Sequence, residues 1–303
     1  MTSSSPDETD AKTHGDSAPS DAHEAARKAL NESPYSQALG IEVESIDDAG
    51  ARLVLPFAEI NSNPGGILHG GCAASLAAVG SHAVARAVLA DDSGPWVIGQ
   101  LQVNYLSAAV AADVIAKARL LRRGRSLCFV AIDITTRDGK AIGTALATVR
   151  ARFDHPQAEL PTTFGDAGES DPGPLAPFIE QQPFIAARGM HIENMSNSRA
   201  RISMPASKAN SDGDGRVHEG AILALLDTTG AMAAWAETGP GKFKASTASI
   251  QIQTLAPPPT GDLIAYGRCI HRDREMLWSD AEVVDAATGR VTTRGTVFYR
   301  LAS

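Results

Sequence analysis

The sequence predicts an α+β protein made of two copies of one domain, each with a long helix packed against an antiparallel sheet. The first observation is an internal repeat, in which the tripeptide His-Gly-Gly at 69–71 returns as His-Glu-Gly at 218–220, with an apolar run after each. A fixed offset that holds along a chain indicates duplicated domains. The second observation is that each copy places one long apolar segment among shorter, strand-length segments, which is typical of a helix layer on a sheet layer.

The same offset of 149 residues aligns positions far from these tripeptides, and a chain of 303 residues suits two domains of ordinary size. We expect a disordered tail over 1–22, a first domain over 23–153, a linker over 154–177 and a second domain over 178–303. The aligned pairs include Gly40 with Gly189, Pro56 with Pro205, Gln102 with Gln251, and Asp113 with Asp262.

The elements of the first copy follow from local composition. Residues 21–31 begin with a possible capping aspartate and are rich in alanine, so they predict a helix. Two strand-length segments flank the turn at 47–50 and predict a hairpin. The alanine-rich segment 71–89 predicts a mostly buried helix. The expected strands are 41–46, 51–55, 97–106, 113–122, 126–137 and 141–153, with Asp138-Gly139 as the turn between the last two.

The second copy repeats this order. We expect a hairpin over 190–204, a long helix over 221–237, and strands over 245–255, 262–272, 276–285 and 290–301.

Composition excludes several classes of protein. The net charge of −8 argues against a general nucleic-acid binder. The polar residues 1–22 lack the apolar core of a secretory signal, and no run reaches the roughly 20 apolar residues that span a bilayer. Three widely spaced cysteines form no disulfide framework and no metal-ligand cluster. We therefore expect a cytoplasmic protein with reduced thiols, no metal, no cofactor and no membrane partner.

The segment 154–171 carries several prolines, glycines and acidic residues, which is typical of a linker. Its length allows two similar domains to meet edge to edge.

The repeated tripeptide lies where a loop becomes a helix. Free backbone N–H groups and the positive end of the helix dipole point outward at such a place, and together they stabilise a developing oxyanion. Glycine at position 70 or 71 lets a substrate approach the backbone closely. The alternative is that His69 braces the loop and that the glycines only allow tight packing.

A single acidic residue stands in the apolar run of the second copy. Asp227 lies in the segment AILALLDTTGAMAA, whereas the first copy has Ala78 at the equivalent position. A buried carboxylate is costly unless it is paired or used, so Asp227 is a candidate catalytic group. The alternative is a structural carboxylate bonded to Thr228 or Thr229.

The order of elements and the motif N-x5-H-G-G-x4-L at 63–76 resemble the hotdog fold, and more narrowly the PaaI-type acyl-CoA thioesterases. The resemblance covers nearly all of 35–153 and 184–301. It implies a double hotdog, in which active sites form at the seams between two paired domains. It also implies that the catalytic acid lies nine residues after the histidine, which is the position of Asp227.

Applied across the pair, the resemblance implies two unequal seams. In one seam, the two domains together supply an acid, a hydroxyl and an oxyanion donor. The resemblance therefore predicts a single composite active site for acyl-CoA hydrolysis at this seam. The other seam has Ala78 and Ile98 in place of the acid and hydroxyl, and Glu219 in place of the oxyanion-side glycine. The predicted catalytic residues are Asn63, His69 and Gly70 from the first copy, and Asp227 and Thr247 from the second.

A basic turn between two strands is a candidate for substrate binding, and the alternative is a solvated basic hairpin. The resemblance implies that a basic turn contacts the phosphates of coenzyme A, which assigns Arg123 and Arg125 to that role, with His271, Arg272 and Arg274 at the equivalent turn of the second copy. Gly71 is expected to allow close approach of the substrate.

Two other functions remain open at this point. The chain could be a non-catalytic acyl-CoA or lipid-binding protein, or a hotdog hydratase, although the sequence lacks the Asp-x4-His loop that the resemblance would require of a hydratase. There is neither a GxxxxGK[ST] phosphate loop nor a GxSxG nucleophile elbow. The double-hotdog units are expected to assemble further as homo-oligomers.

Overall fold

The computed structural model describes residues 21–89, 94–151, 158–166, 168 and 170–303. Most of the expected tail (1–20) lies outside the described residues, as do 152–157 of the domain end and linker. The first described helix begins at Asp21, within the last two residues of the expected tail.

The first copy contains the predicted helices and strands, with boundaries within one or two residues at most ends. Its long helix is α3 (Gly70–Val88), and a short helix α2 (Pro34–Leu39) follows α1. The other elements are α1 (Asp21–Glu32), β1 (Glu42–Asp47), β2 (Gly50–Leu55), β3 (Ser62–Asn63), β4 (Ile67–Leu68), β5 (Trp96–Tyr105), β6 (Val114–Arg123), β7 (Leu127–Thr136) and β8 (Ala141–Ala151).

The second copy repeats this arrangement around the long helix α6 (Glu219–Thr238). Its other elements are α4 (Ala176–Glu180), α5 (Pro183–Arg188), β9 (His191–Ser196), β10 (Arg199–Met204), β11 (Lys244–Thr254), β12 (Leu263–Asp273), β13 (Met276–Asp285) and β14 (Val291–Ala302).

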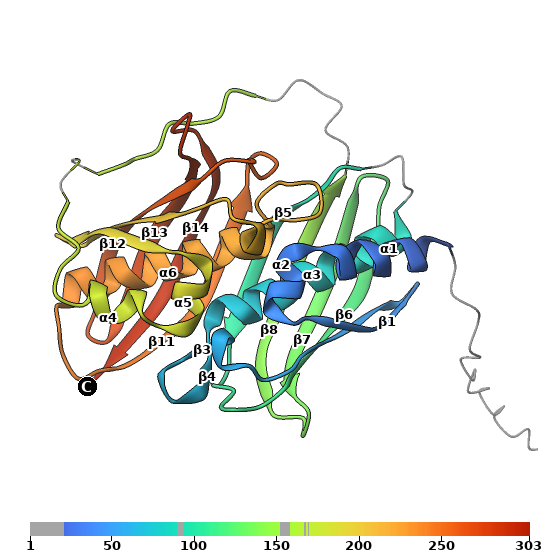
Figure 1. Cartoon of the computed structure of the whole chain (residues 1–303), viewed down its shortest axis with the longest axis horizontal. Helices are drawn as coiled ribbons and strands as arrows, with labels where there is room; N and C mark the ends of the chain where they lie inside the picture. The colour runs from blue at the N-terminus through green and yellow to red at the C-terminus, as the bar shows by residue number, and fades with distance from the viewer. Residues whose placement is uncertain (1–20, 90–93, 152–157, 167, 169) are drawn as a thin grey trace, which may run out of the picture.

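Both domains share one antiparallel sheet of 12 strands, in the order β1-β2-β6-β7-β8-β5-β11-β14-β13-β12-β10-β9. The domains meet where β5 pairs with β11, and Gln102 pairs there with Gln251, its counterpart in the repeat. The two domains are therefore related by an approximate two-fold axis at this pair. Both long helices lie on the same side of the sheet (Figure 1).

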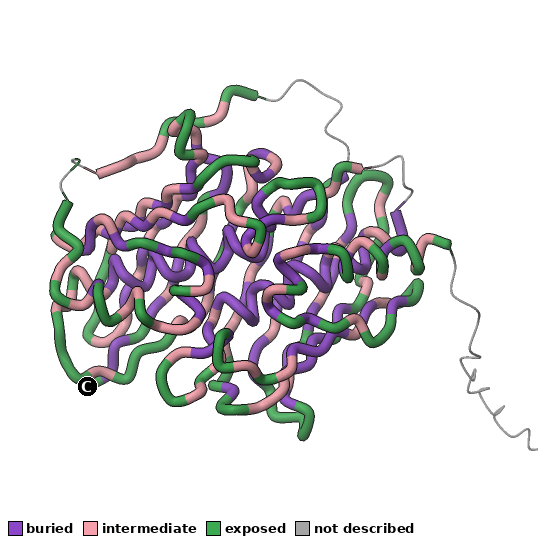
Figure 2. The backbone as a smooth tube through the Cα atoms, in the orientation of Figure 1, coloured by how far each residue is buried: buried purple, intermediate pink, exposed green. Residues whose placement is uncertain are grey.

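The two long helices pack against each other at small residues. An ideal Cβ on Gly71 would lie 2.6 Å from the Cβ of Ala224, and one on Gly220 would lie 2.9 Å from Ser75 Oγ. Nearly every residue of both helices is buried, as the purple segments of Figure 2 show. A helix that is apolar all round requires such burial, which confirms the predicted double hotdog.

The short helices α2, α4 and α5 and the two-residue strands β3 and β4 are elements that the sequence did not predict. Helices α2 and α5 each have six residues and begin with a proline. They end at Gly40 and Gly189, whose φ angles of 77° and 65° favour glycine. A helix of six residues is too short for its apolar periodicity to be recognised in the sequence. The aligned glycines nevertheless mark the C-terminal end of each helix.

The described part of the expected linker is bound to the second domain. Thr162 forms a β-bridge with Arg290, and the Phe164 N–H donates to Glu282 at 2.8 Å. Asp166 forms an ion pair with Arg201. Residues 158–166 of the expected linker thus form a strap along the second domain.

The cysteines and helices add two observations. Cys72, Cys128 and Cys269 are free thiols. None of the described helices is both long and apolar enough to span a bilayer.

The joined sheet predicts that the domains depend on each other. Expressed separately, residues 21–151 and 158–303 should be insoluble or should re-associate, because separation exposes one face of α3 or α6 and an unpaired edge at β5 or β11. Size-exclusion chromatography of each fragment, alone and mixed, tests this. Two soluble, monomeric, well-folded fragments would contradict it.

Candidate active site

His69 and His218 cap the two long helices. In each case the ring Nδ1 accepts the N–H of the residue two positions later, at 2.9 Å. The His69 ring stacks on Phe184 at 4.1 Å, and burial lowers its pKa to about 4. His69 is therefore neutral at pH 7 and braces the helix start, and its predicted catalytic role rests on the sequence motif alone.

At the start of α3, the histidine cap leaves the Gly70 N–H without an acceptor among the described residues. Gly71 donates to His69 Nδ1, and Cys72 donates to the His69 carbonyl at 2.9 Å. Within the described part of the chain, no acceptor takes the N–H of Gly70. This N–H also lies at the positive end of a 19-residue helix, so it can donate to an anionic oxygen.

Asp227 lies directly against Gly70, across the seam between the domains. An ideal Cβ on Gly70 would lie 2.7 Å from Asp227 Oδ2, so only glycine leaves room for the carboxylate. Thr247 donates its hydroxyl to Asp227 Oδ1 at 2.7 Å. Asp227 is 3% exposed, and this burial raises its pKa to about 6, against the lowering effect of the Thr247 hydrogen bond.

Thr247 stands beside an irregularity of the sheet. The register between β11 and β14 shifts between Thr247 and Ser249, and an equivalent shift between β5 and β8 falls between Ile98 and Gln100. A bulge re-aims the side chain beside it. The repeat therefore places the same backbone irregularity in each seam, with a hydroxyl in one and Ile98 in the other.

Tyr105 is a site residue that the sequence reasoning missed. Its ring would lie 3.5 Å from a Cβ on Gly70, and its hydroxyl donates to the Gly70 carbonyl at 3.2 Å. Burial and the charge of Asp227 raise the pKa of Tyr105 well above its usual range. The repeat could have identified it, because the equivalent residue of the second copy is Thr254.

Two predicted residues are placed differently. Asn63 lies in β3, where its backbone pairs with Ile67, and among the described residues its side chain has no hydrogen-bond partner. Gly71 is buried and sits where a Cβ would meet Ala224. The absence of a side chain at Gly71 serves helix packing, so we correct the substrate-contact role that the sequence suggested for it.

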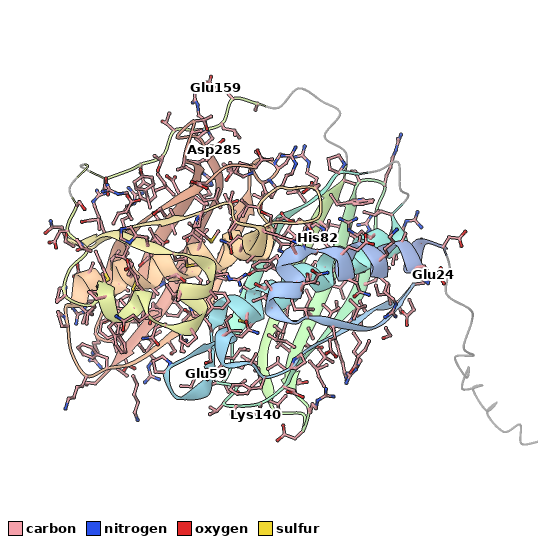
Figure 3. All side chains as sticks on the ribbon, in the orientation of Figure 1. Glu24, Glu59, His82, Lys140, Glu159 and Asp285 are labelled. Carbon is pink, nitrogen blue, oxygen red and sulfur yellow. The ribbon has the colours of Figure 1, made fainter. Side chains whose placement is uncertain are left out.

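In the second seam, Glu219 supplies the buried carboxylate. The Glu219 carboxylate is hydrogen-bonded to the ring of His82 and accepts the N–H of Ile98 at 2.9 Å. His82 lies on α3 near the middle of the molecule, where the domains face each other (Figure 3). The second seam has Ala78, which is fully buried, at the position equivalent to Asp227. Each seam therefore holds one carboxylate, but in the second it projects from the helix start that should present an oxyanion donor.

The predicted phosphate-binding turn lies beside the second seam. Arg123 pairs with Cys128, Cys128 with Val149, and Val149 with Ile98, so Arg123 shares a row across the sheet with the second seam. Arg125 is exposed in the turn beyond it. This row places Arg123 closer to the incomplete seam than the sequence alone indicates, and the role of Arg123 and Arg125 in phosphate binding stays a prediction.

The equivalent turn of the second domain lies beside the complete seam. Thr247 pairs with Tyr299, Tyr299 with Leu277, and Leu277 with Arg272. Three strand spacings separate Thr247 from Arg272, which is about 14 Å. The Arg272 side chain donates to the carbonyl of Arg274 at 3.2 Å.

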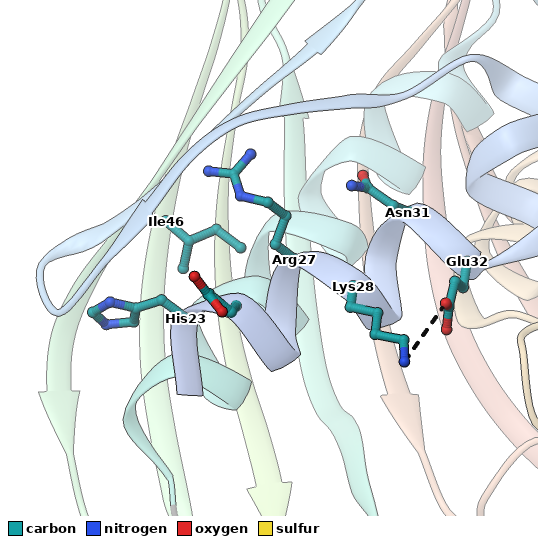
Figure 4. Close-up of a pocket in the computed structure, with 7 residues that line it drawn as sticks. His23, Arg27, Lys28, Asn31, Glu32 and Ile46 are labelled. Carbon is teal, nitrogen blue, oxygen red and sulfur yellow. Dashed lines mark ion pairs between the residues drawn. The ribbon is translucent and has the colours of Figure 1, made fainter. Parts of the chain in front are cut away.

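An open hollow of the described surface lies away from the residues of both seams. It has a volume of about 450 Å³ and runs between α1 and β1, with His23, Arg27 and Ile46 among its lining residues (Figure 4). Charged side chains and exposure to solvent make it a surface groove, distant from both seams (Figure 1). Among the described residues, no three His, Cys, Asp or Glu side chains are placed to hold a metal ion.

Comparisons with known proteins agree with this architecture. Residues 59–150 match the family described as acyl-CoA thioesterase N-terminal domain, and residues 214–292 match the thioesterase superfamily. A Saccharolobus solfataricus protein named "Putative esterase" is 33% identical over 113 residues, which are 35% of this chain and 72% of that protein. Human acyl-coenzyme A thioesterase 13 is 32% identical over 94 residues, which are 30% of this chain and 63% of that protein.

Solved structures share the fold over most of the chain. An acyl-CoA thioesterase II from Mycobacterium marinum has a TM-score of 0.62 at 10% identity, covering 90% of this chain and 96% of that one. A hotdog-fold protein of unknown function from Alicyclobacillus acidocaldarius has a TM-score of 0.59 at 18% identity, covering 86% and 96%. Together with the two matched domains, these findings show that the chain belongs to the thioesterase superfamily, as two hotdog domains in tandem.

Proposed function

We propose that this protein hydrolyses acyl-CoA thioesters at one composite site, in the seam between α3 and α6 that contains Gly70 and Asp227. The observation that carries the proposal is the Asp227 carboxylate, which lies against Gly70 beside an unoccupied N–H at a helix start. Thioester hydrolysis needs these two groups together, a carboxylate to drive the attack and a donor to hold the oxyanion.

In the proposed reaction, the thioester carbonyl oxygen accepts the Gly70 N–H. Asp227 takes a proton from water as the water oxygen attacks the carbonyl carbon. The C–S bond then breaks, and the proton passes from Asp227 to the thiolate of coenzyme A. Direct attack by the carboxylate, followed by hydrolysis of the resulting anhydride, requires the same groups, and both routes need Asp227 ionised.

Neighbouring groups position the reactants. Thr247 fixes one oxygen of Asp227 through its hydroxyl. Tyr105 covers Gly70 and fixes the peptide that follows the N–H donor. We assign the phosphates of coenzyme A to the turn with Arg272 and Arg274, because that turn shares a row of the sheet with Thr247. The narrower assignment to the PaaI-type branch is part of the same proposal.

A hydrolysis screen tests the proposed function. Short, medium, long and aromatic acyl-CoAs should release free thiol in the presence of the protein. Loss of the enoyl absorbance of an enoyl-CoA without thiol release would point to hydration instead, and binding without either reaction would point to a non-catalytic protein.

The pH dependence of the reaction is a sharper test. Because the ionised carboxylate is required and its pKa is about 6, kcat/KM should rise with pH through about 6 and then level off. Thr247→Val removes the hydrogen bond that favours the charged form, so its midpoint should shift to higher pH. A profile that is flat between pH 4.5 and 8, or a midpoint unchanged in Thr247→Val, would contradict the role of Asp227.

A further inference from the structure

Large apolar side chains gather on one part of the surface of the first domain. Five of the ten large apolar residues that are well exposed in the described structure belong to the segments just before α3 and just after β5. Their exposed fractions run from 39% to 56%. Single exposed apolar residues are ordinary, whereas a contiguous group marks a binding surface. We call this group the apolar rim: Phe57, Ile60, Ile67, Leu106 and Val110.

Backbone contacts hold the central part of the rim together as one surface. Ile67 forms a β-bridge with Val110, and the adjoining Leu68 N–H donates to Ala109 at 2.9 Å. Phe57 lies beside the same bridge, because its ring would be 3.7 Å from a Cβ on Gly66. The rim therefore borders the loop that carries β3 and β4, at the lower edge of the molecule near Glu59 in Figure 3.

Two residues of the rim adjoin residues of the candidate active site along the chain. Ile67 is three residues before Gly70, which limits their separation to about 10 Å. Leu106 directly follows Tyr105, whose ring covers Gly70. A chain that leaves a carbonyl group bound at Gly70 toward the first domain therefore meets the rim.

The second seam lacks both the rim and the tyrosine. The equivalent positions carry two alanines, a charged Arg216, a leucine and a proline, and Thr254 replaces Tyr105. The apolar surface thus accompanies the seam that contains Asp227, although both domains have the same fold. A role in folding alone would not explain this difference. The equivalents of the five rim residues are Ala206, Ala209, Arg216, Leu255 and Pro259.

We propose that the apolar rim binds the acyl chain of the substrate, so that the protein selects thioesters with extended apolar acyl groups over acetyl-CoA. This inference rests on the proposed function for the position of the thioester. In this arrangement, the two ends of the bound substrate point in different directions. The acyl chain lies over the first domain, and the phosphates lie toward Arg272 on the second domain. Each methylene buried on the rim strengthens binding by up to about fourfold.

A binding experiment tests the rim independently of turnover. Isothermal titration of the Asp227→Asn protein with acetyl-, butyryl-, hexanoyl- and octanoyl-CoA, below their micellar concentrations, gives the dependence of Kd on chain length. We expect Kd to fall as the chain lengthens. Adding Ile67→Gln or Leu106→Gln should flatten this dependence and leave the Kd for acetyl-CoA unchanged.

A matched control uses another exposed isoleucine. Ile270 is 53% exposed on β12, outside the rim, so Ile270→Gln should keep the full dependence on chain length. Sedimentation velocity of each variant shows whether the rim instead joins two copies of the chain. Dissociation of an oligomer by Ile67→Gln, or an unchanged chain-length dependence in both rim variants, would overturn the inference.

The outcomes separate this inference from the proposed function. If octanoyl-CoA binds through the rim and wild-type protein releases no thiol from it, the inference stands and the hydrolase proposal fails. If thiol is released at equal kcat/KM from acetyl- and octanoyl-CoA, the hydrolase proposal stands and the inference fails. If no acyl-CoA binds at all, both fail.

Discussion

Asp227→Asn is expected to lower kcat for acyl-CoA hydrolysis by at least about 100-fold. Asparagine keeps the shape and can still accept the Thr247 hydroxyl, but it can neither take a proton from water nor attack the carbonyl. The Gly70 N–H remains, so substrate binding should change much less than kcat. Steady-state kinetics on the best substrate of the screen measures both parameters.

The second seam supplies the matched control. Glu219→Gln makes the same chemical change, carboxylate to amide, in the other seam, at the position equivalent to Gly70. Because Ala78 and Ile98 leave that seam without the proposed acid and hydroxyl, Glu219→Gln should keep most of the wild-type kcat. A wild-type rate in Asp227→Asn, or its loss in a folded Glu219→Gln protein, would show that the assignment to a single seam is wrong.

The same substitution, Asp227→Asn, is expected to stabilise the fold at neutral pH. Burial raises the pKa of this carboxyl from 3.8 to about 6, so ionising it costs more in the folded than in the unfolded chain. The shift corresponds to on the order of 3 kcal/mol of unfolding free energy above pH 6. Removing the charge should raise the unfolding free energy by this amount, which corresponds to a rise in Tm of about 5 °C.

The pH dependence gives the sign of this effect. Between about pH 4 and 6 the folded protein keeps the proton of Asp227 that the unfolded chain releases, so the carboxyl's contribution to stability falls as pH rises. Below pH 4 both states are protonated, and the advantage of Asp227→Asn should vanish. Chemical denaturation of both proteins at pH 4 and pH 7.5 measures the difference. An Asp227→Asn protein that is less stable than wild type at pH 7.5 would contradict this account.

Together, these two predictions describe a trade of stability for activity. The buried position that raises the pKa of Asp227 keeps bulk water away from the proposed oxyanion, and it holds the carboxylate against Gly70. A more exposed aspartate would ionise at a lower free-energy cost, but water would then have access to the site. Lower activity and higher stability in one variant would support this reading.

Local sequence determined most of the fold. The long helices were recognisable because α3 and α6 are alanine-rich and apolar over five turns, and the strands because alternation and turn residues mark their ends. The repeat then predicted the pairing of domains, since two equal units with apolar helices bury them best against each other. The glycine at 70 and the acid at 227 stood out for the same reason, as differences between copies that should otherwise be alike.

The positions of the basic turns, of Tyr105 and of residues 158–166 depend on strand pairing and on contacts between segments that are distant in the sequence. Arg123 and Arg272 occupy equivalent positions in the two copies, and only the pairing of β11 with β14, β14 with β13, and β13 with β12 shows that Arg272 shares a row with Thr247. Tyr105 reached the site because its strand ends beside the start of α3. Residues 158–166 became a strap because their partners lie on β10, β13 and β14, which no local pattern indicates.

The sequence by itself therefore determined that this protein is a duplicated α+β unit, and it singled out Asp227 as an acidic residue in an otherwise apolar helix. Periodicity and composition are local properties, and they suffice for helices, strands and the repeat. The resemblance placed Gly70 and Asp227 in one seam, but only the tertiary structure shows their direct contact and the contact of Glu219 with His82. Those contacts join residues more than a hundred positions apart, and their geometry depends on how two helices and two sheet edges meet.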